Sequence, residues 1–237
     1  MRRSPCSRDK EIKHARSTVE RAYKTGVLSP ESNSLHLQLI ALDTDLKRLK
    51  KLDRIQDKVA MKRDELLPKY QPYVERYLAD GDVFKNGLFA HVVVWLFDTE
   101  AFDQAIKWGL VCIAQNQPTP DGIKRNFPTL IADIMLEWCE RQAENGQPVE
   151  PYCSTIFSFV RHDWRLNEKI TAKWFKFVGL LFIRDSNGKP LASAQDDVEK
   201  LKAAQVLFFE AHKLNKNIGV KTLIEKIDMR IRKLADT

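Results

Sequence analysis

A long stripe of apolar residues constrains the fold more than any other feature of the sequence. Its members recur at steps of three and four residues, the spacing of one face of an α-helix. They are Leu35, Leu39, Leu42, Leu46, Leu49, Leu52, Ile55 and Val59. Charged residues flank the stripe, so this helix can bury only a narrow seam, which suits pairing with another helix. The sequence predicts one long amphipathic helix within residues 28–72, which Pro68 and Pro72 are expected to end.

Positive charge is concentrated in the first 26 residues. This arm has eight basic and three acidic residues and carries +5 of the net charge of +7. The basic residues are Arg2, Arg3, Arg8, Lys10, Lys13, Arg16, Arg21 and Lys24. Because Lys and Arg neutralise phosphates and release counterions, the asymmetry favours a polyanionic partner. A solvated arm that only keeps the protein soluble has the same composition and stays an alternative.

Helical periodicity continues on both sides of the long helix. A helix is predicted over residues 7–24, and Ser29 and Pro30 fit the N-cap and first position of the next one. After residue 72 the pattern predicts a compact helical domain. Its expected helices are residues 84–97, 101–115, 130–143, 152–160, 170–183, 191–214 and 220–234. Residues 157–160 and 178–183 can also be interpreted as short strands.

The predicted fold class is therefore mainly α. It has a basic amino-terminal arm at 1–27, a long amphipathic helix at 28–72, and a domain of stacked hairpins at 73–237. Residues 84–115 and 175–215 form two expected hairpins whose packing resembles that of tetratricopeptide repeats, although the repeat period is not sustained.

Cysteine spacing and hydropathy indicate a soluble cytosolic protein without a membrane partner. Cys6, Cys112, Cys139 and Cys153 are too far apart in sequence for a zinc motif, so three are predicted to be ordinary buried thiols. No apolar run approaches the ~20 residues that cross a bilayer. The first residues are not followed by a signal-type apolar core.

No catalytic constellation stands out in the sequence. Two acid-x-lysine motifs, at residues 11–13 and 45–47, resemble part of a nuclease core but fall in predicted helices. The acidic patch Asp196, Asp197 and Glu199 lies at a helix start, where carboxylates are expected from the helix dipole. A phosphate-binding loop is missing, and no nucleophile has the spacing of a triad. We therefore predict no catalytic residue, metal ligand or cofactor.

Three blocks of sequence resemble the small terminase subunit of peduovirus-type tailed phages. The first is residues 62–68 (KRDELLP) with the PYV at residues 72–74, and the second is residues 92–99 (VVVWLFDT) followed by Ala105 and Ile106. The third is residues 179–185 (GLLFIRD) with the GVK at residues 219–221. The blocks occur in the order of the family, and the resemblance covers roughly residues 35–234. Glu100 stands where members of the family often have glycine.

The resemblance implies a DNA-packaging protein of the host cytoplasm. Such a subunit binds double-stranded viral DNA at the cohesive-end site as a homo-oligomer, generally a ring, and recruits or regulates a large subunit that hydrolyses ATP and cuts. The apolar stripe would then join protomers, or alternatively dock onto the chain's own helical domain. Two other functions stay open: the chain is itself the metal-dependent endonuclease, or it is a helical scaffold that binds only protein.

Overall fold

The computed structural model describes residues 30–185 and 188–236, which form helices joined by loops. The prediction of a mainly α fold is confirmed. Residues 157–160 and 178–183, the two alternative strands, lie within helices, and the only extended pairing among the described residues is an isolated bridge between Arg184 and Pro190. The chain divides into two units, Met1–Asp80 and Gly81–Thr237, which are treated one at a time.

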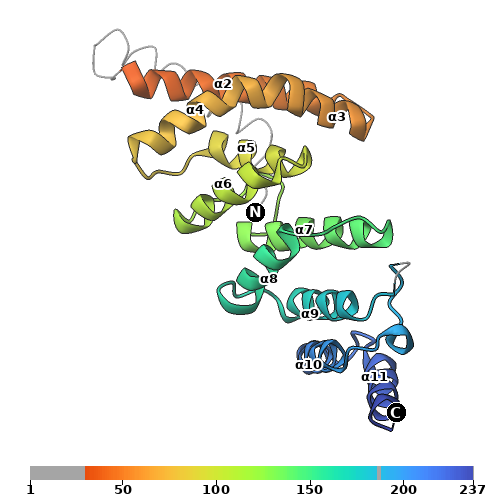
Figure 1. Cartoon of the computed structure of the whole chain (residues 1–237). Coiled ribbons are helices and arrows are strands. Elements are labelled where there is room, and N and C mark those ends of the chain that lie inside the picture. Colours follow the sequence, from red (N-terminus) through yellow and green to blue (C-terminus); the bar gives the residue numbers. More distant parts are fainter. Residues whose placement is uncertain (1–29, 186–187, 237) are drawn as a thin grey trace. The chain divides into compact units, whose positions relative to one another are not determined.

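The first unit is a helical hairpin (Figure 1). Helix α2 (Pro30–Lys50) is followed by a turn at residues 51–54 and then by α3 (Ile55–Met61), a π-helical segment η1 (Lys62–Leu66) and α4 (Leu67–Asp80). Asp45 of α2 contacts Lys69 of α4, while Arg48, further along α2, contacts Glu65 of η1, which precedes Lys69 in the chain. The two limbs are therefore antiparallel. The prediction of one uninterrupted helix is therefore wrong. The narrow apolar seam of α2 finds its partner within the same chain.

The prolines that were expected to end the long helix lie inside its second limb. A proline lacks an N–H donor and its ring crowds the carbonyl of the preceding turn. Here the chain widens into the π-helical segment directly before Pro68, where the N–H of Leu67 donates to the carbonyl of Lys62, five residues back. We infer that this wider turn accommodates Pro68, and that α4 continues through Pro72 because a helix interrupted by proline can bend rather than end.

The second unit contains seven α-helices among its described residues. They are α5 (Gly87–Asp98), α6 (Phe102–Ala114), α7 (Phe127–Glu144), α8 (Tyr152–His162), α9 (Glu168–Phe182), α10 (Val198–Leu214) and α11 (Lys221–Ala235). Each helix packs on the next one along the chain, and α7 also contacts α9. The predicted helix over residues 191–214 begins late, because residues 192–194 form a 3₁₀ turn and Asp197 caps α10.

At two positions in this unit, neighbouring helices approach each other closely at a glycine. The position of a Cβ on Gly179 of α9 lies 2.6 Å from the ring of Phe208 on α10, and that on Gly109 of α6 lies 2.7 Å from Ile131 on α7. Trp174 is fully buried, and its indole N–H donates to the carbonyl of Ala132, which ties α9 to α7. These contacts hold α6 against α7, α7 against α9, and α9 against α10.

The Gly179 contact makes a testable prediction about stability. Gly179→Ala places a methyl group against the buried Phe208 ring, an overpacking that costs about 1–3 kcal/mol, while alanine regains about 1 kcal/mol of helix propensity. We therefore expect a net loss of up to about 2 kcal/mol in the free energy of unfolding. Tryptophan fluorescence during urea unfolding measures it, because all five tryptophans lie in the second unit. In the control Gly87→Ala, the added Cβ has no atom within 4 Å. If the control loses as much stability as Gly179→Ala, the contact with Phe208 is not the cause of the loss.

Other predictions about this unit can be compared directly with the structure. Cys112, Cys139 and Cys153 are buried free thiols, as predicted, and Cys6 lies outside the described residues. Glu100 has a φ of +59°, in the left-handed region that favours glycine, the residue that the resemblance leads one to expect at this position. Within the described residues, no helix is both long and apolar enough to cross a bilayer.

Candidate nucleic-acid interface

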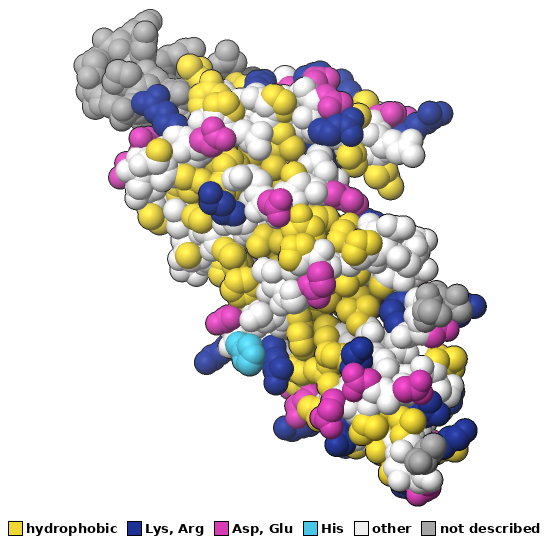
Figure 2. All heavy atoms as spheres, viewed as in Figure 1, with side chains coloured by type: hydrophobic (Ala, Val, Ile, Leu, Met, Phe, Trp, Pro, Cys, Tyr) yellow, Lys and Arg dark blue, Asp and Glu magenta, His cyan; other side chains and the backbone are white. Residues whose placement is uncertain are grey.

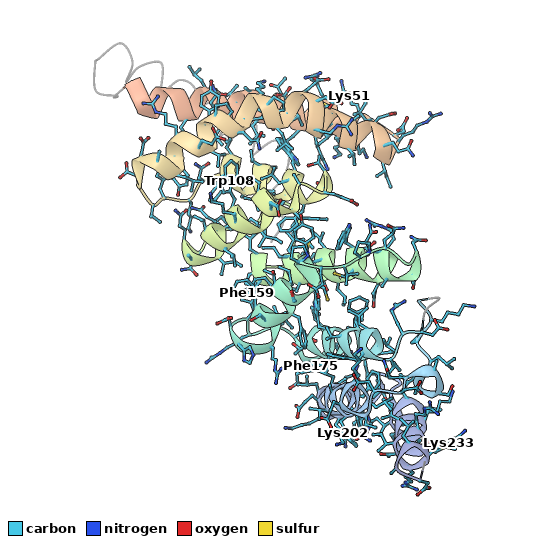
Figure 3. All side chains as sticks on the ribbon, in the orientation of Figure 1. Lys51, Trp108, Phe159, Phe175, Lys202 and Lys233 are labelled. Atoms are coloured by element: carbon cyan, nitrogen blue, oxygen red, sulfur yellow. The ribbon has the colours of Figure 1, made fainter. Side chains whose placement is uncertain are left out.

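A dense group of cations surrounds the turn between α2 and α3. Residues 47–63 contain eight basic and two acidic residues, a local net charge of +6. We call these basic residues the basic turn: Lys47, Arg48, Lys50, Lys51, Arg54, Lys58, Lys62 and Arg63. Figure 2 shows Lys and Arg side chains around this end of the hairpin, and Figure 3 places Lys51 at the end of α2. The hairpin therefore carries its positive charge at one end.

Half of the basic turn is not neutralised by a nearby carboxylate. Lys50, Lys51, Arg54 and Lys58 form no ion pair with any residue in the parts of the chain that the structure describes. The first three are exposed, and Lys58 is half-buried. Basic residues in the last turn of α2 also suit the helix dipole, but Arg54 and Lys58 lie beyond that helix. Uncompensated, exposed cations of this kind are what a phosphate backbone contacts.

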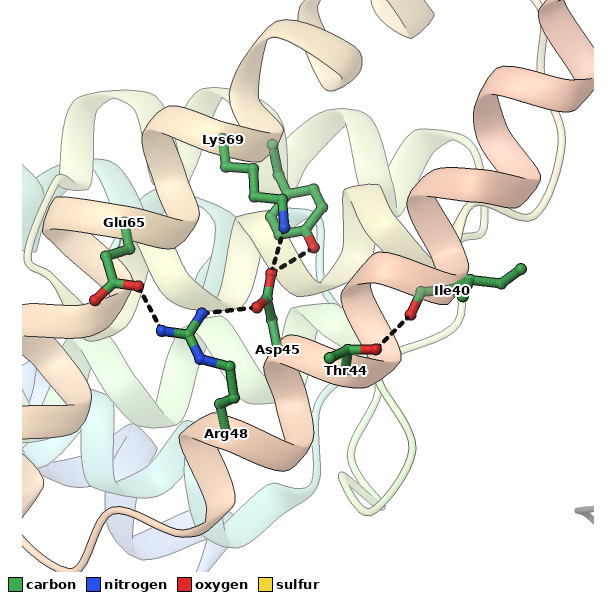
Figure 4. Close-up of polar contacts among 7 residues, drawn as sticks. Ile40, Thr44, Asp45, Arg48, Glu65 and Lys69 are labelled. Atoms are coloured by element: carbon green, nitrogen blue, oxygen red, sulfur yellow. Dashed lines mark hydrogen bonds and ion pairs between the residues drawn. The ribbon is translucent and has the colours of Figure 1, made fainter.

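A buried carboxylate fixes the two limbs of the hairpin together behind the turn (Figure 4). Asp45 of α2 accepts hydrogen bonds from the Lys69 ammonium at 2.7 Å and from the Tyr70 hydroxyl at 2.8 Å, both on α4. Its other oxygen pairs with Arg48 at 2.9 Å, and Arg48 reaches Glu65 at 2.8 Å. We call these five residues the Asp45 cluster. It determines the register of α2 against α4.

The protonation of the Asp45 cluster agrees with this role. Burial alone would raise the pKa of Asp45, but hydrogen bonds from Lys69, Tyr70 and Arg48 outweigh it, so the pKa lies below its ordinary value of 3.8. Burial and the Asp45 carboxylate raise the pKa of the Tyr70 phenol above its ordinary value. At neutral pH, Asp45 is therefore a carboxylate and Tyr70 a hydrogen-bond donor.

The predicted DNA-binding residues of the arm lie outside the described residues. This applies to all eight, from Arg2 to Lys24, and to the helix predicted over residues 7–24. Helix α2 does begin at Pro30, as expected for a proline at a first helical position. The basic turn is not among the sites predicted from the sequence, because residues 27–237 have a net charge of only about +2, in which acidic residues elsewhere cancel the local excess. A count over short windows would have found it.

The stripe predicted to join protomers is divided by the fold. Leu42 and Leu49 are buried on the face of α2 that carries Asp45. Leu39 and Ile55 are exposed, the latter by 77%, and Leu35, Leu46, Leu52 and Val59 are half-buried. Leu37 and Ile40 add further exposed apolar surface to α2. The role of the stripe in self-association stays a prediction. Its exposed members, Leu39 and Ile55, are the ones available for contact with another protomer.

The candidate nuclease motif at residues 11–13 lies outside the described residues, and the described acidic candidates have structural partners. Asp45 belongs to the Asp45 cluster, and Lys47 pairs with Asp43. Asp197 caps α10 by accepting from two backbone N–H groups, and Asp196 pairs with Arg230. In the described ranges, 30–185 and 188–236, no three His, Cys, Asp or Glu side chains come together as a group that could hold a metal ion.

Comparisons with known proteins agree on one family. The family model of the phage small terminase subunit matches residues 39–169, more than half of the chain. A protein of Haemophilus phage HP1 (strain HP1c1), named "Probable terminase, endonuclease subunit", is 39% identical over 196 residues, which cover 83% of this chain and 70% of that protein. No solved structure matches the chain. The matched segment includes the basic turn and the Asp45 cluster.

Proposed function

This chain belongs to the phage small terminase subunit family, and on that premise we propose that it is the DNA-recognition subunit of a genome-packaging machine in the host cytoplasm. It binds double-stranded viral DNA at the cohesive-end packaging site as a homo-oligomer and recruits or regulates the large subunit, which hydrolyses ATP and cuts. The observation that carries this proposal is the basic turn, four of whose cations have no carboxylate partner among the described residues.

DNA binding would use both concentrations of positive charge in the chain. The arm carries +5 over its first 26 residues and the basic turn carries +6 over residues 47–63. Each phosphate neutralised contributes about 0.9 to the slope of log affinity against log salt. A single protomer with a few such contacts binds weakly, and self-association multiplies them along one duplex. The exposed apolar side chains of α2, Leu37, Leu39 and Ile40, with Ile55 of α3, are the surface that we assign to contact between protomers.

We place DNA cleavage in the large subunit. The relative from phage HP1 is named an endonuclease subunit, so cleavage by this chain is the rival function. Three of the carboxylates considered for the rival have other partners: Asp45 in the Asp45 cluster, Asp196 with Arg230, and Asp197 as a helix cap. Nicking of DNA by the purified chain in the presence of Mg²⁺, abolished by changing one of these acidic groups, would support the rival instead.

The experiment for the arm compares three forms of the full chain on a DNA fragment from the cohesive-end region. The arm variant replaces Arg2, Arg3, Arg8, Lys10 and Lys13 by alanine. A paired-cation control replaces Arg76, Arg141, Lys202 and Lys213, each of which has a carboxylate within 4 Å. We expect the salt slope of the arm variant to fall by up to about 0.9 per residue replaced, and that of the control to stay close to wild type.

Three outcomes would contradict the proposal. If wild type and arm variant bind with the same affinity and salt slope, the arm does not contact DNA. If the wild-type chain does not bind the fragment at all, a scaffold that binds only protein is favoured instead. Native mass spectrometry of the same samples, with and without the fragment, measures the oligomer. A chain that stays a single protomer under both conditions would exclude recognition by an assembly.

A further inference from the structure

A groove of about 560 Å³ lies within the second unit, along one face of α8. The residues of α8 that line it recur at steps of four, from Ser154 through Ser158 to His162. The opposite wall comes from the carboxyl-terminal half of α9, and the groove is closed by Gln195, from the segment before α10, and by Lys200, in the first turn of α10. Eight residues of helix span about 12 Å, so the groove has the length of about four residues of extended chain.

The floor of the groove is apolar and open to solvent. Phe157 of α8 faces Val178, Leu181 and Phe182 of α9 across it. The Phe157 ring packs edge-on against the Phe175 ring, with 5.3 Å between the ring centroids, and this contact holds Phe157 in place. Phe182 is 37% exposed. Figure 3 labels Phe159 and Phe175 on the two helices, and Figure 2 shows hydrophobic side chains on the surface of this unit with Lys or Arg side chains beside them.

The rim of the groove is positive. Arg161, Arg184 and Lys200 line it, and the one carboxylate in the lining, Glu150, already accepts a hydrogen bond from the backbone N–H of Ser154. Lys200 also lies 3.9 Å from the carboxylate of Asp197, which caps its own helix. Arg161 has no ion pair with any described residue. The Nε of Arg184 is buried and has no hydrogen-bond partner among the described residues, while its Nη1 donates to the carbonyls of Ala143 and Gly188. Covering the exposed Arg161 with a ligand therefore favours a ligand that supplies carboxylates or carbonyls.

We propose that this groove binds a short protein segment that carries two or more large apolar side chains flanked by carboxylates. The apolar side chains would cover Phe157, Leu181 and Phe182, and the carboxylates would pair with Arg161 and Lys200. The chain's own arm does not fit, because it carries +5 over 26 residues and the rim repels it. A DNA duplex is too wide to reach the floor of a groove that holds about four extended residues.

This inference goes beyond the proposed function, since it assigns a protein-binding site to a unit other than the one that carries the basic turn. The probe is a fluorescein-labelled peptide, Asp-Glu-Leu-Phe-Glu-Asp-Leu-Leu-Asp-Glu, titrated with the full chain and followed by fluorescence anisotropy. One comparison peptide has serine at every apolar position, and a second has lysine at every acidic position. A single-stranded oligonucleotide of equal charge tests whether the rim recognises any flexible polyanion.

Reversing the charge of two residues on the rim tests whether the probe binds in the groove. The groove variant combines Arg161→Glu with Lys200→Glu, and the matched control combines Lys202→Glu with Lys213→Glu, two residues of α10 outside the groove. We expect saturable binding of the probe by wild type, a loss of about tenfold or more in the groove variant, and less than about twofold in the control. Binding to the cohesive-end fragment should differ little between groove variant and control, because both change the net charge equally.

Four results would overturn the proposal: no saturable binding of the probe by wild type below millimolar concentration, equal binding of the serine or lysine peptide, equal binding by the groove variant, or tighter binding of the oligonucleotide than of the probe. The last would reassign the groove to single-stranded nucleic acid. Because the probe contains no DNA, failure here leaves DNA recognition by the basic turn intact, and failure of DNA binding leaves this test unaffected.

Discussion

Replacing Lys50, Lys51, Arg54 and Lys58 together by alanine is expected to lower the affinity of the chain for cohesive-end DNA by about 10²–10³-fold near 0.1 M salt. These four cations have no carboxylate partner among the described residues, so their charge is available to phosphates. The slope of log affinity against log salt should fall by about 3–4, at about 0.9 for each phosphate that is no longer neutralised. Filter binding or electrophoretic mobility shift at several salt concentrations measures both quantities.

The paired-cation control removes four positive charges, as many as the variant of the basic turn. It therefore separates local binding of phosphates from the effect of a change in net charge. Because its four cations are each close to a carboxylate, they are expected to neutralise few phosphates in the wild-type complex. If both variants weaken binding equally, long-range attraction by net charge explains binding and the basic turn has no special role. Non-specific DNA of the same length should respond as strongly as the cohesive-end fragment, since phosphate contacts carry no sequence information.

Periodicity in the sequence predicts the helices of the second unit well. Apolar residues at helical spacing and turn residues such as Asn145, Gly146 and Pro148 identify α7 and its end, and α9 and α11 begin and end within two residues of the predicted positions. These are local signals. The late start of α10 has a local cause too, since Asp197 accepts from the N–H groups of Glu199 and Lys200 and so defines an N-cap.

The hairpin and the groove depend on contacts that no local pattern contains. Pro68 was expected to end a helix, but the π-helical segment before it lets the second limb continue, and only that limb supplies Tyr70 and Lys69 to Asp45. An isolated aspartate within a leucine stripe gives no sign of a partner 25 residues away. The groove joins α8, α9 and the start of α10, and helix periodicity does not specify which surfaces of stacked helices stay uncovered.

Asp45→Ala is expected to destabilise the hairpin by about 2–3 kcal/mol. Removing one partner of a buried ion pair costs about 3–5 kcal/mol, and we reduce this because the side chains of Arg48 and Lys69 are about half exposed and screened by water. The measurement is amide hydrogen exchange in α2 and α4, since the tryptophans all lie in the other unit. At about 1.4 kcal/mol per factor of ten, exchange through local opening should accelerate by about 30–100-fold.

The dependence on pH follows from the lowered pKa of Asp45. A carboxyl group whose pKa is lower in the folded state stabilises the fold fully above its unfolded pKa and loses this contribution as the pH falls through its folded pKa. The difference between wild type and Asp45→Ala should therefore be constant from neutral pH down to about the ordinary value of 3.8 and shrink below it. A difference that already disappears between pH 7 and 5 would contradict the assignment of the charge to Asp45.

Tyr70→Phe distinguishes the Asp45 cluster from simple packing. Alone, it removes the 2.8 Å hydrogen bond to Asp45 from a fully buried side chain and should cost about 1 kcal/mol. In the Asp45→Ala background that hydrogen bond is already absent, so the same change should cost clearly less, and the double-mutant cycle gives the coupling between the two residues. Costs that simply add would mean that Asp45 and Tyr70 act independently. The antiparallel register that presents the basic turn would then depend on the buried leucines of α2, Leu42 and Leu49, rather than on a charged contact.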